Sequence, residues 1–163
     1  NKKLELNILD VSLDRFSSDK FISENLFNNG FNKFDINFIS PTAFKSNGKY
    51  IIYPNRRLIF QSLMNKFDSV NDGEIYDEYS LEKIINGSEI DRYTLSSKYF
   101  SVKGNNIDSF SGHIRLNVFD KDMVGLVNLL LKFGEFSGVG IKSSMGMGAI
   151  KLGRGMGWKE KKN

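Results

Sequence analysis

The stretch from Met123 to Phe133 (MVGLVNLLLKF) is apolar on most sides, so it must be largely buried when the chain folds. We expect this stretch to form a helix. Asp120 can cap the start of this helix, and Gly134 is expected to end it. The other segments of the chain must therefore supply the surface that covers a nearly all-apolar helix.

Strand and helix patterns alternate on both sides of this stretch. Their order is a strand at 34–38, a helix at 56–67, strands at 91–103 and 108–119, the apolar helix, and a strand at 149–152. This order predicts an α+β fold of the ferredoxin-like β-α-β-β-α-β type, with an antiparallel sheet and its helices on one face. The other face would be free to bind single-stranded RNA, as sheets of RRM type do.

The remaining segments are shorter or less regular. We expect a short extended piece at 50–53 after an Asn47-Gly48 turn, a helical turn at 81–85, a strand at 3–13 and a short helix at 21–27. The chain begins at Asn1 rather than methionine, which favours an origin in the later part of a longer protein. Three parts are predicted: the end of a preceding half with a connector (1–33), a ferredoxin-like domain whose glycine-rich loop spans 134–148 (34–157), and a basic tail (158–163).

The amino-acid composition excludes several classes of protein. A hydrophobic content of 40% and an aromatic content of 13% in 163 residues are typical of a folded globular domain. No apolar run approaches the ~20 residues of a membrane span. The chain has no cysteine and one histidine, His113, which excludes disulfides, thiolate metal sites and histidine metal clusters. We therefore expect a cytoplasmic protein that uses no metal or other cofactor.

Glycine and positive charge concentrate near the C-terminus. Eight of the fifteen glycines lie within residues 134–163, together with six basic and two acidic residues. The preceding residues carry seventeen charges of each sign, so the formal net charge of +4 resides in the glycine-rich segment. A neutral body with a basic, glycine-rich edge favours a nucleic acid or another phosphate compound as partner. For the last lysines, a solvated tail is the alternative.

The sequence GVGIKSSMGMG at 138–148 is the candidate anion-binding loop. Glycine permits positive φ and close backbone approach, so successive N–H groups can converge on phosphate oxygens. A Walker loop needs Gly-Lys-Ser/Thr and a dinucleotide fingerprint needs a preceding strand, so neither fits. A purely structural connection between helix and strand is the alternative. The predicted RNA-binding residues of the loop are Gly138, Gly140, Lys142, Ser143, Ser144, Gly146 and Gly148.

Four residues outside the loop are further candidates. Arg56 and Arg57 open a predicted helix, where a phosphate could share the helix N-terminus with both guanidinium groups. Ordinary surface arginines are the alternative for this pair. Arg115 shares a strand face with His113 and is predicted to contact RNA. For His113 we favour a structural or RNA-contacting role over proton transfer.

Four segments in order resemble the RAMP superfamily of CRISPR-associated proteins, in particular the endoribonucleases that process precursor CRISPR RNA. The glycine-rich loop with the Ala149-Ile-Lys-Leu152 strand is one of them. The others are Phe38-Ile-Ser-Pro-Thr-Ala-Phe-Lys45, Tyr53-Pro-Asn-Arg-Arg-Leu-Ile-Phe-Gln-Ser-Leu63 and Phe110-Ser-Gly-His-Ile-Arg-Leu116. Together they cover roughly residues 34 to 152, and the four in order are more specific than the loop alone.

The resemblance implies an enzyme with tandem ferredoxin-like halves that cuts CRISPR repeat RNA without a metal, by attack of a 2′-hydroxyl on the adjacent phosphodiester. It places the catalytic histidine in an N-terminal half, upstream of Asn1, and gives this chain the RNA-binding half. Other subunits of a CRISPR effector complex and a second copy of the chain are further candidate partners. A non-catalytic RAMP subunit that holds guide RNA is the alternative function, and a phosphate-cofactor enzyme is a distant third.

Overall fold

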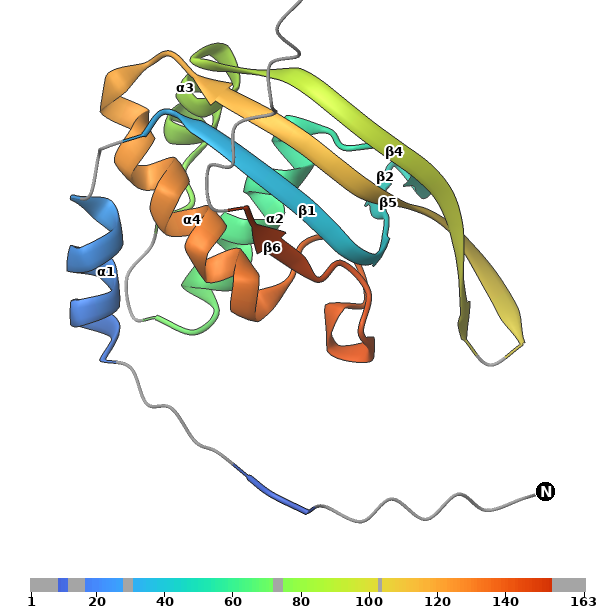
Figure 1. The fold of residues 1–163 in the computed structure, drawn as a ribbon. Helices are drawn as coiled ribbons and strands as arrows, with labels where there is room; N and C mark the ends of the chain where they lie inside the picture. Colours follow the sequence, from blue (N-terminus) through green and yellow to red (C-terminus); the bar gives the residue numbers. More distant parts are fainter. Residues whose placement is uncertain (1–8, 12–16, 28–30, 72–74, 103, 154–163) are drawn as a thin grey trace, which may run out of the picture.

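The computed structural model describes residues 9–11, 17–27, 31–71, 75–102 and 104–153. Its centre is a four-stranded antiparallel sheet with the strand order β4-β5-β1-β6. Helices α2 and α4 pack together on one face of this sheet (Figure 1). The main elements are β1 (Lys33–Thr42), α2 (Arg56–Asp68), β4 (Ser88–Val102), β5 (Asn105–Val118), α4 (Val124–Ser137) and β6 (Ile150–Leu152). The predicted ferredoxin-like fold is confirmed.

Two further helices and a short hairpin are added to the sheet and its two covering helices. A hairpin of β2 (Phe44–Ser46) and β3 (Lys49–Ile51) turns at Asn47 and Gly48, whose φ angles are 48° and 78°. Both angles are positive, as a two-residue hairpin turn requires. Helix α1 (Ser18–Leu26) packs on α4, and α3 (Glu78–Asn86) leads into β4 (Figure 1). The predicted extended piece, helical turn and short N-terminal helix are therefore present.

Alternation along β5 separates the core from the open face of the sheet. Ile114, Leu116 and Val118 are buried beneath the helices, whereas His113 and Arg115 lie on the opposite face. Burial of each such aliphatic side chain stabilises the fold by about 1.5–3 kcal/mol. The apolar stretch of α4 is buried as predicted, and so is the predicted face of α2: Ile59, Phe60, Leu63, Met64 and Phe67.

The sequence predicted that helix α4 ends at Gly134. In the structure the helix continues to Ser137 and is capped by Gly138. A Cβ on Gly134 would lie 2.7 Å from Ile150 Cδ1 and 2.9 Å from Leu63 Cδ2. The glycine therefore lets α4 approach α2 and β6 closely, a role that outweighs the ~1 kcal/mol cost of a glycine inside a helix. Sequence reasoning mistook a packing glycine for a helix end.

The structure differs in detail from two other predictions, the cap at Asp120 and the strand at 34–38. The side chain of Asp120 caps a 3-10 turn, η1 (Lys121–Met123), that precedes α4, rather than α4 itself. Strand β1 runs past Pro41 to Thr42, and its register with β5 shifts before Thr42, an irregularity where a missing proline N–H is tolerated.

Of the strand predicted at 3–13, residues 9–11 are described and lie in no strand, and the rest falls outside the described residues. The predicted basic tail at 158–163 also lies outside them. None of the described helices is long and apolar enough to cross a bilayer.

Candidate nucleic-acid interface

The glycine-rich loop joins the end of α4 to β6. It leaves α4 at Gly138, forms a short 3-10 turn, η2 (Ser143–Met145), and returns to the sheet (Figure 1). Four of its glycines adopt positive φ angles: 63° at Gly138, 73° at Gly140, 92° at Gly146 and 71° at Gly148. Lys142 also has a positive φ, of 52°. This backbone path is one that L-residues with a Cβ rarely adopt.

Two of these glycines are also required by close packing. A Cβ on Gly148 would lie 1.8 Å from the carbonyl oxygen of Val139, and a Cβ on Gly140 would lie 2.3 Å from that of Ala43. A Cβ on Gly146, in contrast, would have no atom within 4 Å. The loop is therefore tightly folded against itself and against the end of β1, and Gly146 lies at its open side.

Most N–H groups of the loop are used inside the protein. Gly140 N–H donates to Ser62 Oγ at 2.9 Å, Gly148 N–H donates to Pro41 O at 3.0 Å, and Gly146 N–H donates to Ser143 O at 3.0 Å. These glycine N–H groups do not converge outward, contrary to the sequence-based expectation. The bonds of Gly140 and Gly148 anchor the loop to α2 and β1, and that of Gly146 lies within the loop. Direct RNA contact by the glycines stays a prediction.

The outward donors lie at the tip of the loop. Lys142 and Ser144 are exposed, and Ser143 is half-buried. Within the part of the chain that the structure describes, the N–H groups of these three residues donate no hydrogen bond to the protein. A lysine, a hydroxyl and three successive N–H groups are thus held together on an anchored turn, and this is a donor set that suits phosphate oxygens.

Lys66, near the end of α2, is a site residue that sequence reasoning missed. Its Nζ donates to the carbonyl oxygens of Ser137 at 3.3 Å and Gly138 at 3.0 Å, and to Ser143 Oγ at 2.9 Å. Burial lowers the pKa of Lys66 from 10.5 to about 8. No motif in the sequence marks this lysine, because its partners lie more than seventy positions further along the chain.

Arg56 and Arg57 stand at the start of α2, as predicted, but both side chains bind α3. Arg56 Nη1 donates to Ile85 O in the last turn of α3, at 2.6 Å, and also to Ser88 O at the start of β4. Arg57 forms ion pairs with Glu78, at 2.7 Å, and with Glu82. The side chain of Arg57 is still 39% exposed. Their predicted contact with phosphate stays a prediction, and it would compete with these bonds.

His113 and Arg115 form a separate cluster with Asp35 on the open face of the sheet. Arg115 Nε donates to Asp35 Oδ1 at 2.9 Å, and His113 Nε2 lies 3.3 Å from the same oxygen. The hydrogen bond to Asp35 raises the pKa of Arg115. The loop contacts β1 near Pro41, six residues beyond Asp35, which is about 20 Å along a strand. The structure therefore brings Lys142–Ser144 and Lys66 together, but not His113 or Arg115 with them.

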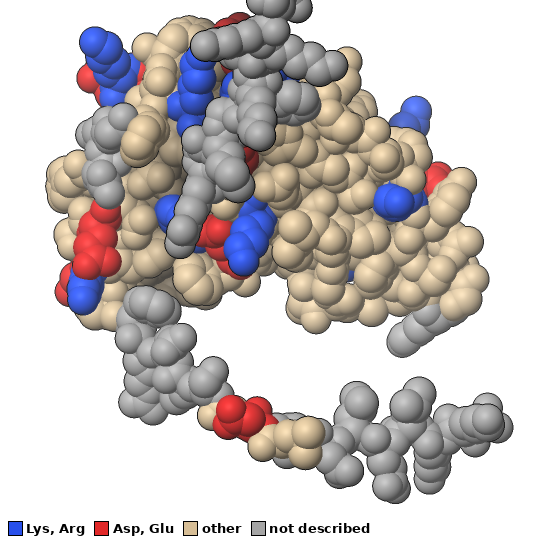
Figure 2. All heavy atoms as spheres, viewed as in Figure 1, with Lys and Arg blue, Asp and Glu red and all other residues tan. Residues whose placement is uncertain are grey.

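Charge on the described surface is mixed. Figure 2 shows Lys and Arg side chains as separate groups on one face, several of them beside acidic side chains, with neutral surface between. This agrees with the balanced charge of the body of the chain. Among the described residues, no group of three or more His, Asp or Glu side chains is arranged to hold a metal ion.

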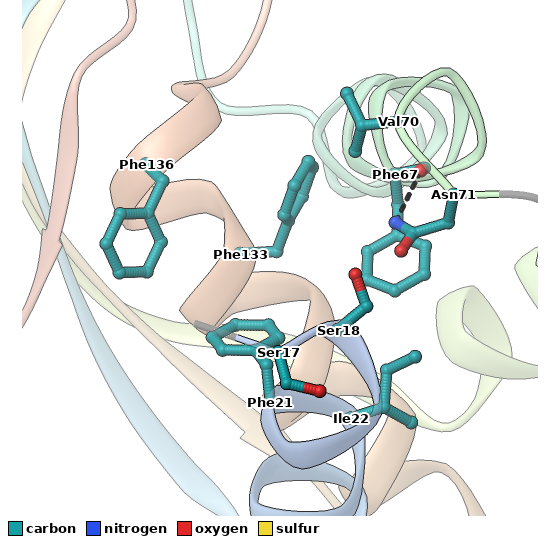
Figure 3. Close-up of a pocket in the computed structure, with 9 residues that line it drawn as sticks. All are labelled: Ser17, Ser18, Phe21, Ile22, Phe67, Val70, Asn71, Phe133 and Phe136. Carbon is teal, nitrogen blue, oxygen red and sulfur yellow. Dashed lines mark hydrogen bonds between the residues drawn. The ribbon is translucent and has the colours of Figure 1, made fainter. Parts of the chain in front are cut away.

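An apolar pocket of about 270 Å³ lies between α1, α2 and α4, apart from the residues above (Figure 3). Phe21, Phe67, Phe133 and Phe136 line it, and Phe21 packs edge-on against Phe136 with ring centroids 6.1 Å apart. Its walls carry no charged side chain. Such a pocket does not suit a phosphate, so the candidate interface remains the tip of the loop.

Comparison with known proteins identifies the family of this chain. Residues 36–150 match the model of the CRISPR-associated endoribonuclease Cas6 family. Cas6 from Streptococcus thermophilus is 40% identical over 153 residues, which are 91% of this chain and 62% of that protein. Cas6 from Mycobacterium tuberculosis is 39% identical over 121 residues, which are 74% of this chain and 38% of that protein. The matched residues thus make up less than two thirds of the length of each of these relatives.

Solved structures agree on the fold. A Cas6 product complex superposes with a TM-score of 0.71 at 19% identity, over 81% of this chain and 56% of that one. The family match covers β1 from Ile36 onward, both sheet-covering helices, the β4–β5 hairpin and the whole glycine-rich loop. On this sequence match and this shared fold, the chain belongs to the Cas6 family of CRISPR-associated endoribonucleases.

Proposed function

We propose that this chain is the RNA-binding C-terminal part of an endoribonuclease that cleaves CRISPR repeat RNA into mature guide RNAs. The observation that carries the proposal is the tip Lys142–Ser144, held by a loop that the Gly140 N–H anchors to α2 and the Gly148 N–H anchors to β1. A preorganised cation with free N–H groups binds a phosphodiester without reorganising first. Membership of the Cas6 family supports RNA as the ligand.

In this proposal the chain holds and orients the RNA backbone. The 2′-oxygen of one nucleotide attacks the adjacent phosphorus, the bond to the 5′-oxygen breaks, and that oxygen leaves with a proton. The products are a 2′,3′-cyclic phosphate and a 5′-hydroxyl. No metal is consumed or required by this step. Lys142 would fix the position of a phosphate, and the proton-transfer groups would come from residues upstream of Asn1.

A non-catalytic role is the second candidate, and one observation favours it. The only histidine of the chain, His113, is held against the carboxylate that also binds Arg115, an arrangement typical of a structural ion pair. A subunit that only retains guide RNA would need the loop but no histidine. We propose repeat RNA as the main partner and the cytoplasm as the setting, with other CRISPR effector subunits and a second copy of the chain as further partners.

Cleavage in chelator separates the two candidates. The full-length protein is incubated with its own repeat RNA in EDTA, and the products are resolved at nucleotide resolution. A single cut that leaves a 2′,3′-cyclic phosphate supports the nuclease. Tight binding without a cut supports the scaffold, and a cut that needs added Mg²⁺ contradicts the metal-independent step. Absence of both binding and cleavage would overturn both functions.

A further inference from the structure

Lys66 lies where three separate pieces of the fold meet. It belongs to the last turn of α2, and its ammonium group donates to the final carbonyl groups of α4 and to Ser143 at the start of η2. The three acceptors, Ser137 O, Gly138 O and Ser143 Oγ, match the three N–H donors of a protonated lysine. All three N–H donors of the Lys66 ammonium are therefore used where α2, the end of α4 and η2 meet, and we call this contact the Lys66 junction.

The Lys66 ammonium meets partial negative charge at this junction, although burial outweighs that attraction and lowers its pKa. The carbonyl end of α4 carries the partial negative charge of the helix dipole, which a cation stabilises. The carboxylates of the same elements are engaged elsewhere. Asp68 accepts the N–H groups of Ile75 and Tyr76, and Glu135 accepts from Lys132 and from the Leu152 N–H. Lys66 thus faces neutral acceptors. Lys142, the cation of the loop itself, is exposed at the tip of the loop.

The position of the tip depends on this junction. Ser143 directly follows Lys142, and its hydroxyl is the contact that ties η2 to Lys66. Gly138, the residue at which the chain turns out of α4, is held by the same ammonium. A shift of about 1 Å in a binding group is enough to cost a large part of its effect.

We infer that Lys66 is a positioning residue for the RNA-binding loop: its ammonium group holds Ser143 against the end of α4 and so sets the place of Lys142 on the RNA backbone. This inference rests on the proposed function. A methionine at this position offers no N–H donor to the three acceptors, so the loop loses the bonds that tie it to α2 and the end of α4.

The test compares Lys66→Met and Lys66→Arg in the full-length protein. Affinity for repeat RNA is measured at pH 7, with Lys20→Met as the control that removes one exposed charge from α1. Lys66→Met should weaken binding about tenfold, whereas Lys20→Met should leave it almost unchanged. Lys66→Arg keeps several N–H donors and a cation at this position, so it should bind more tightly than Lys66→Met.

A second measurement reports on the loop itself. Hydrogen exchange at the N–H groups of residues 139–149 should be faster in Lys66→Met than in wild type, while exchange in the core strands stays the same. If Lys66→Met does not fold, Lys66→Gln, which keeps two N–H donors without the charge, replaces it in both measurements. Equal effects of the neutral variant and Lys20→Met on affinity, or exchange in residues 139–149 equal to that of wild type, would overturn the inference. If wild type does not bind RNA at all, the proposed function fails instead.

Discussion

Arg115 and Asp35 are cross-strand partners whose side chains are joined by a hydrogen bond of 2.9 Å from Nε to Oδ1. Each side chain is only 12% exposed, although both lie on the face of the sheet that carries no helix. His113, which is 21% exposed, approaches the same carboxylate oxygen. The Asp35 carboxylate thus contacts both His113 and Arg115, the two candidate site residues predicted on this face.

Asp35→Ala should therefore destabilise the fold. The substitution leaves the guanidinium of Arg115 without its acceptor in a poorly exposed position, which costs about 2 kcal/mol. Urea unfolding followed by circular dichroism measures the loss. Asn117→Ala is the matched control, because Asn117 lies on the same strand face and makes only a long, exposed bond to Glu89. Similar losses for the two variants would contradict a structural role for the Asp35–Arg115 pair.

Local patterns were enough to predict the fold. The alternation of Ile114, Leu116 and Val118 fixed the inner face of β5, and the apolar stretch of α4 fixed the element above it. The prediction that α4 ends at Gly134 was wrong because a glycine that ends a helix and a glycine that allows close packing look the same in the sequence. Only the tertiary neighbours of the residue distinguish them. The contacts with Ile150 and Leu63 that explain it are long-range.

The site was less predictable for the same reason. Lys142 could be found because it sits among glycines, but Lys66 has its partners in a distant helix end. Arg56 and Arg57 were correctly placed at a helix start, yet their acceptors on α3 lie more than twenty residues away. Sequence patterns report local backbone geometry, whereas the partner of a long side chain is decided by the tertiary fold.

Two glycines of the loop should respond very differently to alanine. Gly148→Ala adds a Cβ that would lie 1.8 Å from Val139 O at a φ of 71°, so the loop must rearrange and more than about 3 kcal/mol of stability is lost. Gly146→Ala meets no atom within 4 Å and bears only the strain of its positive φ, about 1 kcal/mol. Urea unfolding of both variants checks the order, and a larger loss for Gly146→Ala would contradict the packing described.

The adjacent arginines Arg56 and Arg57 should also differ. Arg56→Ala removes the donor to the carbonyl groups of Ile85, in the last turn of α3, and Ser88, at the start of β4, and should cost about 1–2 kcal/mol of stability. Arg57→Ala removes exposed ion pairs with Glu78 and Glu82 and should cost less than about 1 kcal/mol. Thermal unfolding ranks the two. Repeat-RNA affinity of the folded Arg57→Ala variant then tests its predicted phosphate contact, which an unchanged affinity would exclude.

Lys66 should give stability an unusual dependence on pH. Its pKa is about 8 in the folded chain against 10.5 ordinarily, so between these values the unfolded chain binds more protons than the folded one. Stability from this group therefore rises with pH across that window, as the cost of burying its charge disappears. The difference in unfolding free energy between wild type and Lys66→Met, measured by urea at pH 8 and pH 10, should increase. A decrease would mean that the folded state raises this pKa.

Lys142→Ala should weaken RNA binding and reduce its dependence on salt. A lysine that neutralises one phosphate of a single strand contributes about 0.7 to the slope of log affinity against log salt, and the variant should lose that contribution. Lys142→Arg keeps the charge and should keep most of the slope. Lys20→Ala, on exposed α1, is the control for loss of charge alone. Filter binding of repeat RNA at several salt concentrations gives the slopes, and an unchanged slope in Lys142→Ala would remove the loop tip from the RNA interface.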